Sequence, residues 1–302
     1  MNAKIRGGLY GLLVGDALGV PYEFHPASAL PPMEWIEFQP PAGFPRAHAG
    51  TPIGTWSDDG AQALALLDSL CRCGKLDLED LGDRLLSWLN GGEYTADGRV
   101  FDVGITTARA LHAFAAGAPA AASGPSGDRD NGNGALMRVL PLALWHRGDD
   151  GSLVEDAHRQ SLLTHGHPRS QVCCALYVLW ARAVMDEEPD AFQLAVGRLR
   201  GIYGGSSHRG ELEAFVMPAF NSRPGGTGYV VDCLRSAVWA CEGADYAEVV
   251  RRAVSLGDDT DTTACVAGGI AGLRWGEDGI PVRWREALRG RELVERLLAG
   301  LG

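Results

Sequence analysis

The sequence has no long hydrophobic run, no excess of basic charge and almost no strand-like alternation. No stretch approaches the roughly 20 consecutive apolar residues of a membrane-spanning helix, so we expect no membrane association. The formal net charge is −11, which disfavours general nucleic-acid binding because a phosphate backbone repels an acidic surface. Alternating polar and apolar runs are nearly absent, so a β-sheet has no obvious source.

The chain also lacks paired cysteine and histidine motifs. It has seven cysteines, an odd number, and Cys71-Arg-Cys73 has no second pair at zinc-site spacing. Most lie in apolar, helix-like surroundings, which indicates free thiols in a reducing compartment. The short apolar run over 8–14 is broken by Gly15 and Asp16 without a cleavage-like site, so we expect a mature cytoplasmic protein.

Helical periodicity is the dominant pattern. Apolar residues at helical spacing predict helices over 60–71, 134–146, 168–185, 228–241, 245–256 and 262–275. Pro141 should kink or end a turn of the second helix, and Pro168 suits the first position of the third. Two Pro- or Gly-rich stretches, 25–56 and 119–133, predict long loops, which in a compact domain tend to be functional. We therefore predict one compact all-α domain over residues 1–302.

The first acidic cluster, Ser57-Asp58-Asp59, lies directly ahead of the predicted helix over 60–71. Taken alone, it has an ordinary structural explanation. Serine is a good N-cap, and acidic residues in a first helical turn are stabilised by the helix dipole.

The second acidic cluster, Asp258-Asp259-Thr260-Asp261-Thr262, lies ahead of the predicted helix over 262–275. Capping explains it less well, because three carboxylates within four residues repel one another. Carboxylate and hydroxyl oxygens are ligands for hard cations such as Mg²⁺ or Mn²⁺. Two such clusters at helix starts could face each other and hold two cations. A calcium-binding EF-hand is excluded, since its ligand spacing and closing glutamate are missing.

These clusters and five further segments occur in the order found in a known family. The segments cover residues 15–23 (GDALGVPYE), 56–59 (WSDD), 102–107 (DVGITT), 131–138 (NGNGALMR), 164–168 (THGHP), 228–230 (GYV) and 257–262 (GDDTDT). Together they resemble the ADP-ribosylglycohydrolase family, which includes dinitrogenase-reductase-activating glycohydrolase and the ADP-ribosyl-acceptor hydrolases. The resemblance covers most of the chain and implies a compact orthogonal helical bundle.

The resemblance assigns a role to each matching position. It implies two divalent cations, Mg²⁺ or Mn²⁺, and it identifies Glu23 and Asp102 as acid/base residues whose individual roles stay open. It implies six metal ligands, Ser57, Asp58, Asp59, Asp259, Asp261 and Thr262, and seven substrate-binding residues, Asn131, Gly132, Asn133, Gly134, Met137, His165 and Tyr229. The glycine-rich segment suits a diphosphate, since its free N–H groups point at the anion.

Two positions depart from the family pattern. Gly60 stands where the family usually has threonine, so we expect a looser helix start. Asp258 replaces a glycine, which leaves a second register of metal ligands open. Two further residues stay ambiguous. Arg138 could fix the loop through an ion pair or contact the diphosphate, and Asp16 is expected to be a structural hydrogen-bonding residue.

The implied reaction is hydrolysis of the glycosidic bond between ADP-ribose and an acceptor. Cations would orient the ribose hydroxyls and lower the pKa of a bound water, while carboxylates stabilise an oxocarbenium-like transition state. The partner is then an ADP-ribosylated protein or an ADP-ribose-containing small molecule, with arginine the favoured acceptor. Serine, a nucleic-acid end and a small metabolite stay open, and a monomer is one option for the oligomeric state.

Three other interpretations compete with this one. The chain could be a catalytically weak ADP-ribose-binding or toxin-immunity protein of the same fold, which turnover measured beside ADP-ribose binding would separate from an active enzyme. It could be another two-metal hydrolase such as a phosphoesterase, although neither acidic cluster contains the histidine usual in such sites. It could also be a structural helical protein, for which melting curves with and without metal would coincide.

Overall fold

The computed structural model describes residues 3–301, so the ends of the predicted domain, residues 1–2 and 302, lie outside the described residues. Within 3–301 there is no strand, only two isolated bridges, and no helix has the length and apolarity to cross a membrane. The helices are α1 Ala3–Gly19, α2 Asp58–Cys73, α3 Leu78–Gly91, α4 Ile105–Ala115, α5 Ala120–Ser123, α6 Gly134–Met137, α7 Leu140–Trp145, α8 Asp150–Leu162, α9 Pro168–Met185, α10 Ala191–Tyr203, α11 Ser207–Glu211, α12 Met217–Ala219, α13 Val230–Ala240, α14 Tyr246–Val254, α15 Thr260–Trp275, α16 Val282–Ala287 and α17 Arg291–Leu298. Short turns of other helix types cover Val20–Tyr22, Ala27–Ala29, Met33–Trp35, Leu212–Val216, Glu277–Gly279 and Ala299–Leu301. The predicted all-α fold is confirmed.

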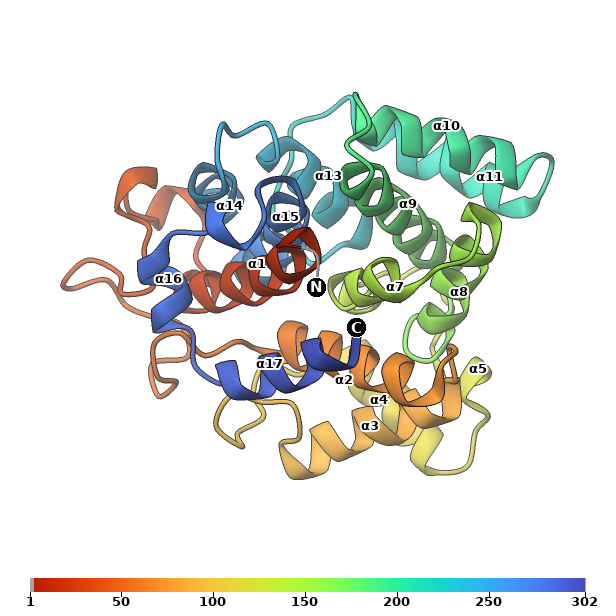
Figure 1. Ribbon diagram of the computed structural model, residues 1–302, viewed down its shortest axis with the longest axis horizontal. Coiled ribbons are helices and arrows are strands. Elements are labelled where there is room, and N and C mark those ends of the chain that lie inside the picture. Colours follow the sequence, from red (N-terminus) through yellow and green to blue (C-terminus); the bar gives the residue numbers. More distant parts are fainter. Residues whose placement is uncertain (1–2, 302) are drawn as a thin grey trace.

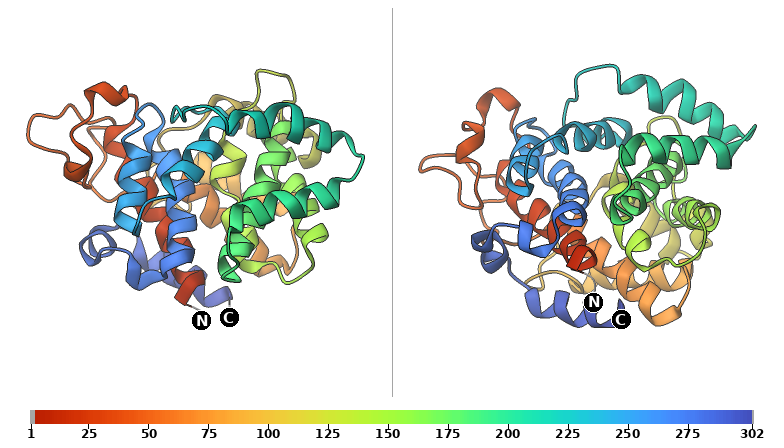
Figure 2. Two further views of the ribbon diagram at one scale, coloured as in Figure 1. Left: turned by 90° about the horizontal axis from the view of Figure 1, so that it is seen from above. Right: turned by 45° about the horizontal axis from the view of Figure 1, so that its top comes forward.

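The centre of the fold is a pair of helices from opposite ends of the chain, α1 and α15, which run side by side (Figures 1 and 2). Glycines at every fourth position of α1 lie against the α15 backbone: Gly7, Gly11, Gly15 and Gly19. A Cβ atom at Gly15 would lie 2.1 Å from the carbonyl oxygen of Ala264. Only glycine permits this separation, so the two helix backbones touch and their site-bearing ends are fixed together.

The remaining helices surround this pair at varied crossing angles (Figure 1). Helix α9 is buried over most of its length and packs on α8, α10, α13 and α15. It spans Pro168–Met185 with proline in its first turn, as predicted. Cys173 and Cys174 on this helix are buried free thiols, and the other five cysteines are free as well.

Two segments differ from the prediction. The expected helix over 134–146 is two short helices, α6 and α7, separated at Arg138 and Val139, and Pro141 lies in the first turn of α7. The chain breaks there because proline has no N–H to continue an earlier helix. The expected loop over 119–133 contains a helical turn, α5, whereas 25–56 is irregular apart from two 3₁₀ turns, as predicted.

The start of α2 is fixed by Asp16 of α1. The Asp16 carboxylate accepts hydrogen bonds from the backbone N–H groups of Ser57 and Gly60, each at 2.8 Å, which confirms its structural role. A Cβ atom at Gly60 would lie 2.7 Å from the side chain of Leu13. The expectation of a loose helix start is therefore wrong: glycine is needed there so that α2 can approach α1.

Candidate active site

A pocket of about 240 Å³ opens where the N-terminal ends of several helices converge. Its walls come from segments far apart in the sequence, namely the turn after α1 and the starts of α2, α4, α6 and α15. The lining residues are Glu23, Asp58, Asp102, Gly104, Ile105, Thr106, Thr107, Gly132, Asn133, Gly134, Met137, His165, Gly228, Asp259 and Thr262. Most of the predicted site residues thus line a single pocket, among them both proposed acid/base residues.

The two acidic clusters face each other at the floor of this pocket. The hydroxyl of Thr262 on α15 donates a hydrogen bond of 3.2 Å to Asp59 on α2. Carboxylate oxygens of Asp16, Asp59 and Asp261 lie within 4.8 Å of one another, as do those of Glu23, Asp259 and Asp261. The predicted convergence of α2 and α15, some two hundred positions apart, is therefore present in the fold.

The floor contains oxygen atoms that the protein itself does not satisfy. One carboxylate oxygen of Asp59 and one of Asp261 are buried without a hydrogen-bond partner. A buried charged oxygen without a hydrogen-bond partner destabilises the fold. Such oxygens are suitable ligands for a hard divalent cation. Serine and threonine hydroxyls at Ser57 and Thr262 complete an all-oxygen donor set. These residues therefore fit divalent cations of the Mg²⁺ or Mn²⁺ type.

The electrostatics of the floor agree with this donor set. Burial, reinforced by repulsion from neighbouring carboxylates, raises the pKa of Asp58, Asp59 and Asp261 well above the usual value. Burial also raises the pKa of Glu23 to about 10. Without positive charge nearby, the mutual repulsion of these carboxylates destabilises the fold. The dipoles at the N-terminal ends of α2 and α15 offset only part of that repulsion.

Asp258 is placed differently from its neighbours. Its side chain is exposed, and its backbone has a φ of 55°. Its N–H and carbonyl groups pair with His25 and Phe24, which ties the loop after α1 to the start of α15. Asp259 and Asp261, by contrast, lie in the carboxylate clusters. The geometry thus favours the register in which Asp259 and Asp261 face a cation.

Asp58 is held by a buried polar chain rather than by an ion pair. The Gln62 amide donates a hydrogen bond of 3.0 Å to the Asp58 carboxylate, and the Arg138 guanidinium donates one of 3.0 Å to the amide oxygen of Gln62. The Arg138 guanidinium, fully buried, also bonds to both the side chain and the carbonyl of Gln160. Burial lowers its pKa to about 10. Arg138 therefore fixes the glycine-rich loop, although its partners are neutral groups and not an ion-pair partner. It does not line the pocket, so it is not placed to contact a diphosphate there.

The glycine-rich segment lies against the second acidic cluster. The side-chain amide of Asn133 donates a hydrogen bond of 2.8 Å to the Asp259 carboxylate. Its backbone N–H donates another to the carbonyl of Gly228. A Cβ atom at Gly134 would lie 2.8 Å from the ring of His165. Glycine is therefore required where the backbone passes His165, and the segment is held as one wall of the pocket.

His165 is buried under this wall. Its Nδ1 lies 2.9 Å from the Thr164 hydroxyl. Burial lowers its pKa to about 3, assisted by the positive charge of Arg138. The imidazole is therefore neutral, so it can offer a substrate a single N–H donor but no positive charge.

Two predicted substrate residues lie outside the pocket wall. The Asn131 side chain is engaged by Asp128 and Ser170, while its carbonyl accepts from the N–H of Val230. Tyr229 is partly exposed at the rim, and the Arg169 guanidinium donates a hydrogen bond of 3.3 Å to its hydroxyl. Three predicted metal ligands, Ser57, Asp59 and Asp261, lie beneath the lining residues.

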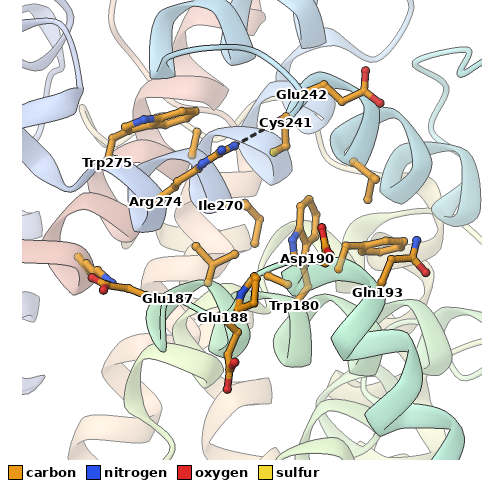
Figure 3. Close-up of a pocket in the computed structure, with 17 residues that line it drawn as sticks. Trp180, Glu187, Glu188, Asp190, Gln193, Cys241, Glu242, Ile270, Arg274 and Trp275 are labelled. Atoms are coloured by element: carbon orange, nitrogen blue, oxygen red, sulfur yellow. Dashed lines mark hydrogen bonds and ion pairs between the residues drawn. The ribbon is translucent and has the colours of Figure 1, made fainter.

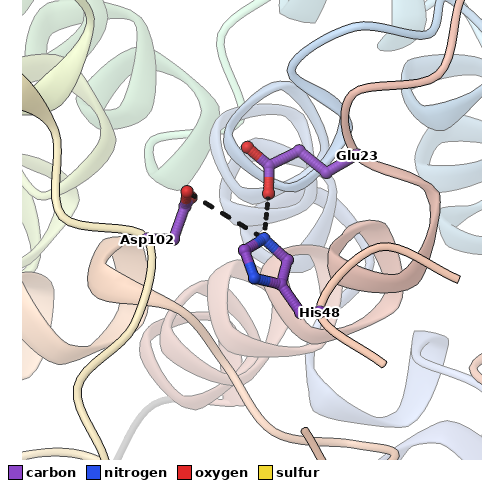
Figure 4. Close-up of side chains that lie close together, drawn as sticks. All are labelled: Glu23, His48 and Asp102. Atoms are coloured by element: carbon purple, nitrogen blue, oxygen red, sulfur yellow. Dashed lines mark hydrogen bonds and ion pairs between the residues drawn. The ribbon is translucent and has the colours of Figure 1, made fainter. Parts of the chain in front are cut away.

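The proposed acid/base residues flank a third group that sequence reasoning missed. Figure 4 shows His48 between Glu23 and Asp102, with its Nε2 atom 2.6 Å from Glu23 and 3.9 Å from Asp102. His48 lies in the proline-rich stretch over 25–56, where no helical or motif spacing marks it. The one sequence signal for His48 is that it lies in the long loop over 25–56, which was predicted to be functional.

A larger cavity of about 660 Å³ lies at the opposite ends of α9 and α15 (Figure 3). Its floor is apolar, with Trp180 and Ile270, and its rim carries Glu187, Glu188 and Arg274. No metal-type cluster of the described residues falls in it. The metal-type clusters found among the described residues lie at or beneath the smaller pocket.

Comparison with known proteins agrees with this geometry. A family model described as ADP-ribosylglycohydrolase matches residues 1–301. The chain belongs to the ADP-ribosylglycohydrolase family. A solved structure titled "ADP-ribosylglycohydrolase-related protein complex" is similar to this glycohydrolase with a TM-score of 0.78 and 32% identity, covering 99% of this chain and 96% of that one.

Two curated relatives are similar over the full glycohydrolase. The ADP-ribosyl-[dinitrogen reductase] glycohydrolase of Rhodospirillum rubrum is 30% identical, covering 100% of this chain and 98% of that protein. The ADP-ribosylarginine hydrolase Tri1 of Serratia proteamaculans is 29% identical, covering 97% of this chain and 77% of that protein. The chain is accordingly a hydrolytic enzyme that acts on ADP-ribose linkages.

Proposed function

We propose that this enzyme is a divalent-metal-dependent hydrolase that removes ADP-ribose from arginine side chains of modified proteins. The observation that carries the proposal is the pair of facing acidic clusters with unpartnered oxygens on Asp59 and Asp261. A floor of this kind needs cations, and it lies beneath a pocket of pentose size. The relatives named as arginine and dinitrogen-reductase hydrolases support the reaction class.

Six residues would hold two cations, either Mg²⁺ or Mn²⁺: Ser57, Asp58, Asp59, Asp259, Asp261 and Thr262. When bound, the cations would orient the hydroxyls of the proximal ribose and lower the pKa of a nearby water. The chain itself then supplies the fixed carboxylates, which stabilise positive charge at the anomeric carbon as the glycosidic bond lengthens.

Proton transfer falls to Glu23 and Asp102, which face the pocket from different loops. One takes a proton from the attacking water, and the other gives a proton to the departing nitrogen. The Glu23 side chain is 4% exposed and Asp102 is more open to solvent. Glu23→Gln and Asp102→Asn should each lower kcat more than they weaken ADP-ribose binding; the reverse pattern would make them binding residues only.

The rest of the substrate extends from the floor along the glycine-rich wall. A pocket of about 240 Å³ is smaller than the cavities of 300–1,000 Å³ typical for whole ligands, so it takes the ribose end. The backbone of Gly132 and Gly134 and the N–H of His165 would contact the diphosphate. Met137 would form apolar wall, and Tyr229 at the rim would stack on the adenosine side.

The charge of the pocket supports an arginine acceptor. Asp102 and Glu23 line the pocket together, and carboxylates attract a guanidinium group. Phe24 is 68% exposed beside them and offers an aromatic face to a cation. A neutral serine linkage would gain neither contact.

Two further properties belong to the proposal. The seven free thiols fit a reducing compartment and support a cytoplasmic location. The functional unit is proposed to be a single domain over residues 1–302, with a monomer as one option for the oligomeric state.

The test is release of ADP-ribose from arginine-linked, serine-linked and nucleic-acid-linked substrates, before and after metal removal. We expect turnover of the arginine linkage, loss on chelation and recovery with Mg²⁺ or Mn²⁺. Asp58→Ala and Asp261→Ala should lower it by at least ~100-fold. Undiminished turnover of the chelated enzyme would refute metal dependence, and ADP-ribose binding without turnover would instead make the chain a binding or immunity protein.

A further inference from the structure

We propose that His48 is a positioning residue that holds the Glu23 carboxyl group in the orientation needed for cleavage. The inference rests on the proposed function, since Glu23 is one of its two acid/base residues. His48 lies in a loop that carries no sequence motif, and its contacts form a connection between the loop after α1 and the loop before α4.

The contact with Glu23 is direct. His48 Nε2 lies 2.6 Å from a carboxylate oxygen of Glu23, in a surrounding where the Glu23 side chain is almost fully buried (Figure 4). Glutamate has three side-chain torsions, so a buried carboxyl group on a loop needs a partner to select one orientation. Asp102 lies on the other side of the same ring nitrogen at 3.9 Å. His48 therefore sets the position of Glu23 with respect to Asp102.

The His48 ring is itself held in place. It packs against Phe24 with ring centroids 5.5 Å apart and against Phe101 at 5.0 Å. These two aromatic residues adjoin Glu23 and Asp102 in the chain. The ring thus fills the space between the two proposed acid/base residues, and its own orientation is fixed by packing rather than by solvent.

The backbone around His48 is a built turn. The N–H of Ala47 donates to the carbonyl of Pro21, and the N–H of Thr51 donates 2.7 Å to the carbonyl of His48. Arg46 and Arg99 bond to the carbonyls of Thr51 and Gly50. Two of these contacts reach outside the turn, to the 3₁₀ turn after α1 and to the loop before α4.

His48 also adopts a backbone conformation that residues other than glycine rarely use, with φ at 48°. Such a conformation is strained and persists only where the surrounding contacts enforce it. Glycine would relieve the strain but would remove the ring. A strained histidine at this turn indicates that the imidazole is needed where it lies.

The experiment compares three variants with the wild type in ADP-ribose release, ADP-ribose binding and crystal structure. His48→Ala removes the contact. His48→Gln places an amide near the position of Nε2, whereas the shorter His48→Asn does not reach it. Asparagine tolerates positive φ better than glutamine does. If backbone strain alone set the activity, His48→Asn would therefore be more active than His48→Gln. His112→Ala, an exposed histidine on α4, is the matched control.

We expect kcat to fall ~10- to 100-fold in His48→Ala and His48→Asn, with KM and ADP-ribose affinity changed less than about threefold. His48→Gln should recover most of kcat, and His112→Ala should match the wild type. A kcat within twofold of wild type in His48→Ala, or His48→Gln as slow as His48→Ala, overturns the proposal.

The crystal structures separate this proposal from the proposed function. If the wild type releases no ADP-ribose, the proposed function fails, and the orientation of Glu23 decides the role of His48. A Glu23 carboxyl group that turns away in His48→Ala and returns in His48→Gln supports positioning. A carboxyl group unmoved in His48→Ala contradicts it.

Discussion

Replacing Asp59 by asparagine should stabilise the metal-free protein and destabilise the metal-loaded protein, each relative to the wild type. Asp59 is fully buried at the pocket floor, where one oxygen accepts from Thr262 and the other has no partner. The asparagine side chain would keep the shape and the acceptor for Thr262 while removing one charge. The metal-free variant should therefore be more stable than the metal-free wild type, although the metal-loaded variant should be less stable than the metal-loaded wild type.

The expected shifts follow from the structure. Two charges at the outer separation of 4.8 Å repel by about 3 kcal/mol at an effective dielectric constant near 20, and partial protonation of the cluster relieves some of this. Unfolding entropy near 2.1 cal/mol/K per residue gives about 0.6 kcal/mol per degree for 302 residues. The metal-free variant should thus melt about 2–5 °C higher than the wild type. Two cations at a hundred times their Kd should raise the melting temperature of the wild type by about 9 °C.

The assay is thermal melting of chelated protein with and without Mn²⁺. Asp68→Asn is the control, because Asp68 lies on the same helix but bonds to Arg72 and Tyr94 outside the pocket. It should melt lower than the wild type and keep the full metal shift. An Asp59→Asn variant that melts below the wild type when both are metal-free, or that keeps the full Mn²⁺ shift in melting temperature, would contradict a repelled Asp59 charge at a cation site.

Three other predictions concern different parts of the structure. Gly15→Ala should lower stability by about 1–3 kcal/mol or more in denaturant titration, because its Cβ would lie 2.1 Å from a backbone oxygen of α15; an unchanged midpoint would contradict the close packing. Gly134→Ala should weaken ADP-ribose binding about tenfold, measured by calorimetry, by displacing His165, and unchanged affinity would remove the glycine-rich wall from the site. Burial, with help from His208, lowers the pKa of His158 to about 3, so the unfolded chain takes up a proton below about pH 6.5 that the native state refuses, and stability should fall towards pH 3 by up to about 1.4 kcal/mol per pH unit. His158→Phe should flatten that slope in melting curves between pH 4 and pH 7; an unchanged slope would assign it to other groups.

Helices α2, α9, α13, α14 and α15 were predictable, as were the acidic clusters, because apolar spacing and motifs are local features of the sequence. Helix α9 matches its predicted range, and Pro168 marks its start. The facing of the clusters could be anticipated only in outline, since their meeting depends on the glycine face of α1 against α15, a tertiary contact that helical periodicity does not reveal.

Residues placed by tertiary contact were harder to predict. His48 is brought to Glu23 by a turn whose contacts reach the 3₁₀ turn after α1 and the loop before α4. Arg138 follows a glycine-rich segment, where a basic residue indicates an anion partner, yet the break between α6 and α7 directs it into the core towards Gln62 and Gln160. Local pattern identifies the residue type at such positions but does not determine which way the side chain points.

The proposed reaction requires two cations held at the N-terminal ends of α2 and α15, beside the substrate pocket. The most direct measurement is anomalous diffraction from crystals of the enzyme soaked in Mn²⁺. We expect two peaks on the order of 4 Å apart, between Asp59 and Asp261 and within bonding distance of their unpartnered oxygens. Crystals with no anomalous peak between those two carboxylates at saturating Mn²⁺ would contradict it.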